Sequence, residues 1–177
     1  YSVQIINIHV TKRVEPVPIS QNSQKSHPER LICGIAVDIY SIVIPDKYDP
    51  AAIPGAWQKF WKEFPKADLP NSSVAFGTSF PIHTSPGMLH YIAGVEVPAG
   101  YTAPAGFELA TIPAGNYLEI THQGNISGLA QSYGEAYGVV FPQAGLEMRE
   151  GPHLEVYDSM LDPNSDEFTM GILIPVQ

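Results

Sequence analysis

Short segments in which apolar residues alternate with polar ones, or run without interruption, dominate the chain and are separated by turns rich in Gly and Pro. Residues 31–44 are rich in Ile and Val and stop before Pro45, which is typical of a well-buried strand. The same criteria predict strands at residues 2–10, 73–80, 89–97, 107–112, 116–122, 152–158 and 167–176. The polar stretch 12–30 is expected to be an irregular connection.

Two stretches follow the helical period instead. The first covers residues 56–64, with Pro54 suited to its first turn, and ends before Pro65. One of its faces is wholly aromatic, with rings at i, i+3, i+4 and i+7, namely Trp57, Phe60, Trp61 and Phe64. Such a stripe most often packs into a core. Four rings without an aliphatic partner also offer a surface for cation–π contacts, so both interpretations stay open.

The second helix is predicted over residues 125–141, with Asn125 or Ser127 as the N-cap. Its apolar face consists of Leu129, Tyr133, Ala136, Tyr137 and Val140. Three glycines weaken it by up to about 1 kcal/mol each relative to alanine. Tertiary packing is therefore expected to stabilise this helix.

Together these elements suggest an internal duplication. Residues 31–98 and 106–177 each follow the order strand, helix, strand, strand, and a linker of small residues joins them. A chain of 177 residues with 44% hydrophobic residues suits one core better than two, so we expect a single domain over residues 1–177. The predicted fold class is α+β: one antiparallel sheet, two main helices on one face, and a ligand groove between the halves.

The net charge of −9 argues against direct binding of nucleic acid, which relies on clusters of Lys and Arg. From residue 68 onward there are 12 acidic residues and one basic residue, Arg149. This half cannot neutralise its own carboxylates, so a buried acid there must be protonated, hydrogen-bonded or waiting for an external cation. An acidic, solvated surface is the ordinary alternative.

Several kinds of chemistry find no support in the sequence. The six histidines are scattered singly, and no nucleotide-binding or serine-hydrolase motif occurs, so neither a metal nor a cofactor is expected. Cys33 is the only cysteine and lies in an apolar run, which predicts a buried thiol. No apolar run is long enough to cross a membrane, and we expect a soluble, cytoplasmic protein.

One acidic residue, Glu155, lies in the middle of the apolar strand 152–158. Strand alternation puts it on the same face as His153 and Tyr157, and puts Leu154 and Val156 on the other. This face is either solvated or turned toward a pocket in which the carboxylate meets a positively charged ligand. Aromatic residues that could wall such a pocket are Tyr91, Tyr117, Tyr133, Tyr137, Tyr157, Trp57, Trp61 and Phe76. Glu96 and Glu119 are weaker candidates for the acidic role and are expected to be exposed.

The order of several segments resembles the GyrI-like effector-binding domain, the ligand domain of bacterial transcription activators of the BmrR and Rob type. In the second half these segments are Ile112–Tyr117, Thr121–Gly124 and Gly151–Asp158, and in the first half Ala56–Phe60, Val74–Gly77 and Tyr91–Val97. The resemblance covers about residues 31–177. It implies the duplicated fold, a groove at the pseudo-twofold axis, and a buried Glu among aromatic rings, for which the matching position is Glu155.

The resulting hypothesis is a stand-alone effector-binding protein, similar to those found in integron cassettes, which binds small hydrophobic cations and is linked to transcription regulation or drug sensing. A homodimer or a separate regulator protein are the protein partners that we consider. Two alternatives stay open. Some GyrI-like proteins are hydrolases, and Glu155 could be a general base with a pKa raised by burial. The chain could also be a protein-interaction module, as gyrase inhibitors are.

Overall fold

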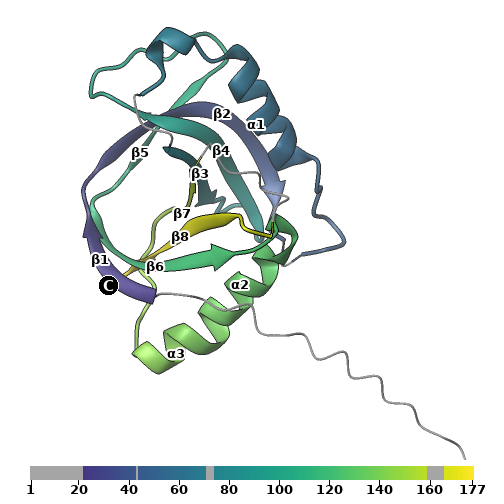
Figure 1. Cartoon of the computed structure of the whole chain (residues 1–177), viewed down its shortest axis with the longest axis vertical. Coiled ribbons are helices and arrows are strands. Elements are labelled where there is room, and N and C mark those ends of the chain that lie inside the picture. Colours follow the sequence, from purple (N-terminus) through teal and green to yellow (C-terminus); the bar gives the residue numbers. More distant parts are fainter. Residues whose placement is uncertain (1–21, 43, 71–73, 159–165) are drawn as a thin grey trace, which may run out of the picture.

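Eight strands form one antiparallel sheet in the order β1-β6-β8-β7-β3-β4-β2-β5 (Figure 1). The computed structural model describes residues 22–42, 44–70, 74–158 and 166–177, and the strand predicted at residues 2–10 lies outside these ranges. The strands are β1 Asn22–His27, β2 Arg30–Tyr40, β3 Val74–Pro81, β4 Met88–Val97, β5 Glu108–Ile112, β6 Gly115–Gln123, β7 His153–Asp158 and β8 Thr169–Val176. The predicted α+β class with an antiparallel sheet is confirmed.

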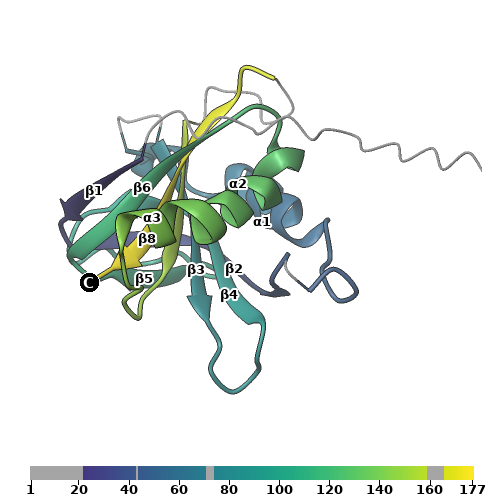
Figure 2. The same ribbon diagram turned by 90° about the horizontal axis from the view of Figure 1, so that it is seen from below.

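The two main helices cover the outside of the curved sheet (Figures 1 and 2). Helix α1, Ala52–Glu63, buries Ala56 and Phe60 against β2 and β4. The second helical segment comprises Ile126–Gly128, α2 Leu129–Glu135, a π-helical stretch Ala136–Val140 and α3 Phe141–Ala144, and it packs on apolar residues of β6 and β8. No helix in the described ranges is long and apolar enough to cross a membrane.

The internal duplication is visible in the order of the elements. The first unit is β2-α1-β3-β4 and the second is β6-α2-β7-β8. The two units join where β3 pairs with β7, so these strands lie at the centre of the sheet, with α1 over one half and α2 over the other. Residues of β7 therefore lie within reach of both helices.

Strand β1 corrects the prediction that residues 12–30 are an irregular connection. Asn22–His27 pairs with β6 along its whole length. The segment contains no apolar residue, and residues 23–26 are exposed. It forms a strand because an edge strand is stabilised by backbone hydrogen bonds to one neighbour and needs no buried face of its own. A search for hydrophobic alternation could not find this strand, because all of its side chains are polar.

The largest differences from the predicted element ends occur in β2 and in the second helical segment. Strand β2 ends at Tyr40 rather than at residue 44, because Ser41 and Ile44 form a turn. Helix α1 begins at Ala52, so Pro54 lies in its first turn as predicted. The second helical segment continues to Ala144, three residues beyond the predicted end at residue 141, and it ends at Gly145 in the left-handed conformation at φ +62°.

Candidate functional site

The carboxylate of Glu155 is buried. Its side chain is 7% exposed and lies on the helix-covered face of the sheet, while Leu154 and Val156 point to the opposite face. Of its neighbours on the same face, His153 and Tyr157 are half-buried. The interpretation of this face as a solvated one is therefore wrong for Glu155.

Three tyrosine hydroxyl groups surround the carboxylate. Tyr157 donates a hydrogen bond of 2.6 Å to Oε2, Tyr133 of α2 donates to Oε1 at 3.3 Å, and Tyr91 of β4 donates to Oε2 at 3.4 Å. The hydroxyl of Tyr91 accepts a hydrogen bond of 3.0 Å from the indole nitrogen of Trp57 in α1. Elements from both halves of the sheet and from both helices thus converge on one carboxylate.

Among the described residues, Glu155 has no ion pair with Lys, Arg or His. Other acids obtain cations from the N-terminal part of the chain: Arg30 pairs with Glu96, and Lys25 pairs with Glu119. Within the same ranges, no three His, Cys, Asp or Glu side chains gather as a metal site would require. The buried carboxylate is therefore held by neutral donors.

Burial raises the pKa of Glu155 above its ordinary value, and the hydrogen bonds from the three tyrosines oppose this rise without cancelling it. Burial, together with the nearby carboxylate, raises the pKa values of Tyr91, Tyr133 and Tyr157 well above their ordinary range, so the hydroxyls stay protonated and can donate. Burial also lowers the pKa of His153, which keeps this neighbour neutral at pH 7. The site therefore disfavours the ionised form of Glu155 and, among the residues that the structure describes, offers it no positive charge.

Aromatic rings from both helices flank the carboxylate. Trp57 meets Tyr157 edge to face at 5.3 Å and stacks on Trp61 at 6.1 Å. Tyr133 stacks on Tyr137 at 6.3 Å, and the π-helical stretch that begins at Ala136 carries this second ring. Trp61 is 42% exposed and Tyr137 is 37% exposed, so the walls reach the surface.

The aromatic face of α1 is divided between two roles. Phe60 and Phe64 are buried in the core with Phe107, as the core-packing interpretation predicts. Trp57 contacts Tyr91 and Tyr157 beside Glu155, and Trp61 stacks on Trp57 at the surface. The core-packing interpretation is thus confirmed for Phe60 and Phe64, and the cation–π interpretation stays a prediction for Trp57 and Trp61.

Gly77 is a site residue that sequence reasoning missed. It lies in β3 directly opposite Glu155. A Cβ atom at this position would be 2.2 Å from the hydroxyl oxygen of Tyr91 and 2.9 Å from Oε2 of Glu155. The missing side chain makes the room in which the two polar groups meet. A glycine inside a predicted strand was the available signal.

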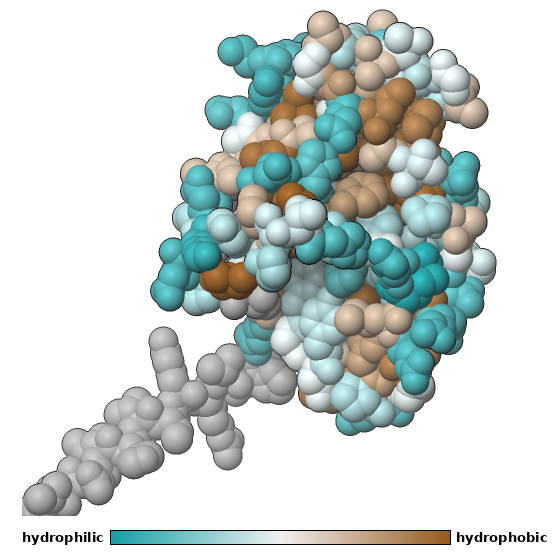
Figure 3. Space-filling model, turned by 180° about the vertical axis from the view of Figure 1, so that it is seen from behind, coloured by the Kyte–Doolittle hydropathy of each residue, from teal (hydrophilic) through white to brown (hydrophobic). Residues whose placement is uncertain are grey.

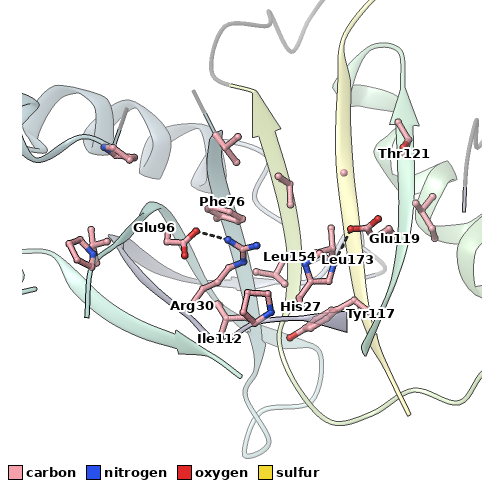
Figure 4. Close-up of a pocket in the computed structure, with 18 residues that line it drawn as sticks. His27, Arg30, Phe76, Glu96, Ile112, Tyr117, Glu119, Thr121, Leu154 and Leu173 are labelled. Atoms are coloured by element: carbon pink, nitrogen blue, oxygen red, sulfur yellow. Dashed lines mark hydrogen bonds and ion pairs between the residues drawn. The ribbon is translucent and has the colours of Figure 1, made fainter. Parts of the chain in front are cut away.

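Phe76 and Tyr117 lie on the other face of the sheet. They belong to a separate apolar cluster with Leu154 and line a cavity of about 630 Å³ on the helix-free side (Figure 4). Glu96 and Glu119 line the same cavity, and their side chains are half-buried and ion-paired rather than fully exposed. The predicted site residues are therefore distributed over two places: Glu155 and six aromatic residues lie at the first, and Phe76 and Tyr117 lie in this cavity.

A family model for the GyrI-like small molecule binding domain matches residues 39–177. The chain belongs to this family. The match confirms the resemblance drawn from the sequence, and it covers the second half of the duplication and the first half from residue 39 onward. It establishes a domain for binding small molecules.

Among curated proteins, the transcriptional regulator BrlR of Pseudomonas aeruginosa is 35% identical over 94 residues, which cover 51% of this chain and 34% of BrlR. The chain thus matches about a third of that regulator. Among solved structures, SAV2435 bound to tetraphenylphosphonium has a TM-score of 0.68 at 19% identity, with 89% of this chain and 94% of that chain covered. The integron cassette protein VCH_CASS2 of Vibrio cholerae has a TM-score of 0.64 at 16% identity, with 88% and 95% covered. At these identities the two structures show the shared fold.

Proposed function

We propose that this GyrI-like domain binds hydrophobic organic cations and that Glu155 supplies the opposite charge. The observation that carries the proposal is a buried carboxylate whose hydrogen-bond partners are neutral tyrosines and whose surroundings include no described cationic group. Ionising a carboxylate in such a place is unfavourable until a cation arrives. A bound cation supplies the positive charge that the site lacks and so stabilises the ionised carboxylate.

The aromatic walls support the same ligand class. Trp57 and Tyr133 approach the carboxylate from different helices, and their partners Trp61 and Tyr137 extend the ring surface outward. A ring face attracts a cation by about 0.5–2 kcal/mol, depending on how far water is excluded. Flat aryl groups also bury well against such rings. A lipophilic cation with aromatic substituents fits both demands.

Two relatives agree with this proposal without deciding it for this chain. SAV2435 was solved with tetraphenylphosphonium, an aryl cation, and BrlR is a transcriptional regulator. We therefore extend the proposal to a sensing role, in which ligand binding is passed to a transcription regulator.

The test is a titration of the protein with tetraphenylphosphonium, followed by tryptophan fluorescence. Both tryptophans, Trp57 and Trp61, lie at the site, so a ligand there should change their emission. Glu155→Gln keeps the shape and removes the charge, and it should weaken binding by about 10- to 100-fold. Glu63→Gln, which removes an equal charge from the exposed end of α1, should leave the affinity unchanged.

A neutral aryl compound, triphenylphosphine oxide, separates charge recognition from simple burial. It should bind the wild type and Glu155→Gln equally. Equal affinity of both proteins for the cation would refute the role of Glu155. Consumption of an electrophilic ester by the wild type, lost in Glu155→Gln, would favour the hydrolase alternative instead, because a buried carboxyl with a raised pKa suits a general base.

A further inference from the structure

The helix-free side of the sheet lines a half-open cavity that the Glu155 site does not use. Strand β1 pairs at one end of the sheet, and β2 lies next to the other end. Only Pro28 and Glu29 separate these two strands, so the chain draws the ends of the sheet together and the sheet curls on itself (Figure 1). The cavity of about 630 Å³ inside this curl lies within the usual range for small-molecule sites.

The floor of the cavity is apolar and is built by both halves. Phe76 of β3, Ile112 of β5, and Leu154 and Val156 of β7 line it together with Tyr117 of β6. Phe76, Ile112, Leu154 and Tyr117 are each at most 6% exposed. A ligand that reaches this floor must therefore offer apolar surface, since no described charge lies among these residues.

The charged side chains of the cavity lie at its more exposed rim, and each already has a partner (Figure 4). Arg30 pairs with Glu96 and also lies 5.5 Å above the ring of Phe76. Glu119 pairs with His27 at 2.8 Å and with Lys25. Burial would raise the pKa of Glu119, but Lys25 and the contact with His27 outweigh burial and hold its pKa below the ordinary value. The rim thus carries balanced charge and has none left over for a charged ligand.

We propose that this cavity is a second binding site, for uncharged and largely apolar small molecules. The two sites should prefer different ligands. The carboxylate of Glu155 has no cationic partner among the described residues and would attract a cation, whereas the charged side chains of this rim already pair with one another. The two sites share β7 but use opposite faces of it, with Glu155 on one side and Leu154 and Val156 on the other. A ligand can therefore occupy either site without contacting the other.

The test uses the full chain and the neutral fluorophore N-phenyl-1-naphthylamine, whose emission rises in apolar surroundings. We expect one probe molecule to bind per chain, with equal affinity for the wild type and Glu155→Gln. Saturating tetraphenylphosphonium should not displace it. Displacement by that cation would place the probe in the Glu155 site and overturn the proposal, as would a failure of the probe to bind.

Two substitutions fill the cavity from neighbouring strands. Gly171 of β8 lines it, and a Cβ atom there would meet Val156 at 3.4 Å, an ordinary contact, so Gly171→Phe should place a ring in the cavity. Thr121→Phe does so from the half-buried wall of β6 and serves if the first variant fails to fold. Each should weaken probe binding by about tenfold or more while tetraphenylphosphonium binding persists. Unchanged probe affinity in a folded variant would contradict the proposal.

Discussion

Replacing Gly77 by alanine should damage both the stability of the fold and the site around Glu155. The added Cβ would lie 2.2 Å from the hydroxyl oxygen and 2.9 Å from Cζ of Tyr91. The ring of Tyr91 is fully buried, so it cannot turn away into solvent. It must shift within the core, and its hydrogen bonds to Trp57 and Glu155 must lengthen or break.

The size of the effect follows from these contacts. Overpacking a core typically costs about 1–3 kcal/mol. Losing two hydrogen bonds adds about 1 kcal/mol each. Alanine recovers about 0.5–1 kcal/mol, because its unfolded chain is less flexible than that of glycine. The free energy of unfolding should therefore fall by roughly 2–4 kcal/mol, and the melting temperature by about 10 °C.

Urea denaturation followed by circular dichroism measures this change. Gly134→Ala in α2 is the matched control, because nothing lies within 4 Å of its added Cβ, and it should stabilise the protein by up to about 1 kcal/mol. Adding Tyr91→Phe to Gly77→Ala removes the closest contact, so the double variant should be more stable than the sum of the single effects predicts. A Gly77→Ala protein as stable as the wild type, or strict additivity in the double variant, would refute the steric reasoning.

Three further predictions concern titration. Burial raises the folded-state pKa of Glu155, so the wild type loses stability as the pH rises above the ordinary carboxyl pKa and through the folded-state pKa. Glu155→Gln should therefore be more stable than the wild type at pH 8, and the difference in urea midpoints should vanish toward pH 4. Tyr157→Phe removes the shortest hydrogen bond to the carboxylate of Glu155 and should therefore raise the pKa of Glu155. The pH at which tetraphenylphosphonium binding is half-maximal should rise with it, and an unchanged midpoint would refute the role of Tyr157 in stabilising the ionised form. Burial lowers the pKa of His90, but its hydrogen bonds to Asp38 and Glu108 outweigh burial and raise this pKa. His90→Gln should therefore reduce the stability of the fold by under about 1 kcal/mol at pH 5.5, where the histidine is charged, and should not change it at pH 9. Thermal melts at both pH values measure the difference.

The sequence predicted the parts of the fold that depend on local periodicity. Alternation in β7 identified Glu155 and put Tyr157 beside it, and the helical period placed Trp57 and Tyr133 on inward faces. Their meeting at one carboxylate required the pairing of β3 with β7, which no local pattern specifies.

The wrong predictions for Phe76 and Tyr117 also arise because strand pairing is not specified by local sequence. The register between β3 and β7 turns Phe76 away from Glu155, because Phe76 lies opposite Val156 and shares its face. Tyr117 likewise faces the cavity, and an aromatic composition alone cannot reveal which face a ring occupies. Strand β1 was not predicted, because an edge strand can be wholly polar and then shows no hydrophobic pattern. The hydropathy of the surface offers little further guidance, since on the face shown in Figure 3 hydrophobic residues are interspersed with hydrophilic ones.

The alternation of β7 also constrains how this protein can change over evolutionary time. Because Glu155 and its two neighbours Leu154 and Val156 point to opposite faces, single substitutions can alter one face and leave the other as it was. An insertion or deletion of one residue within the strand would exchange the faces, moving the acid into the apolar cavity and an aliphatic side chain among the tyrosines. We therefore expect related domains to vary in residue type along this strand but to keep its length.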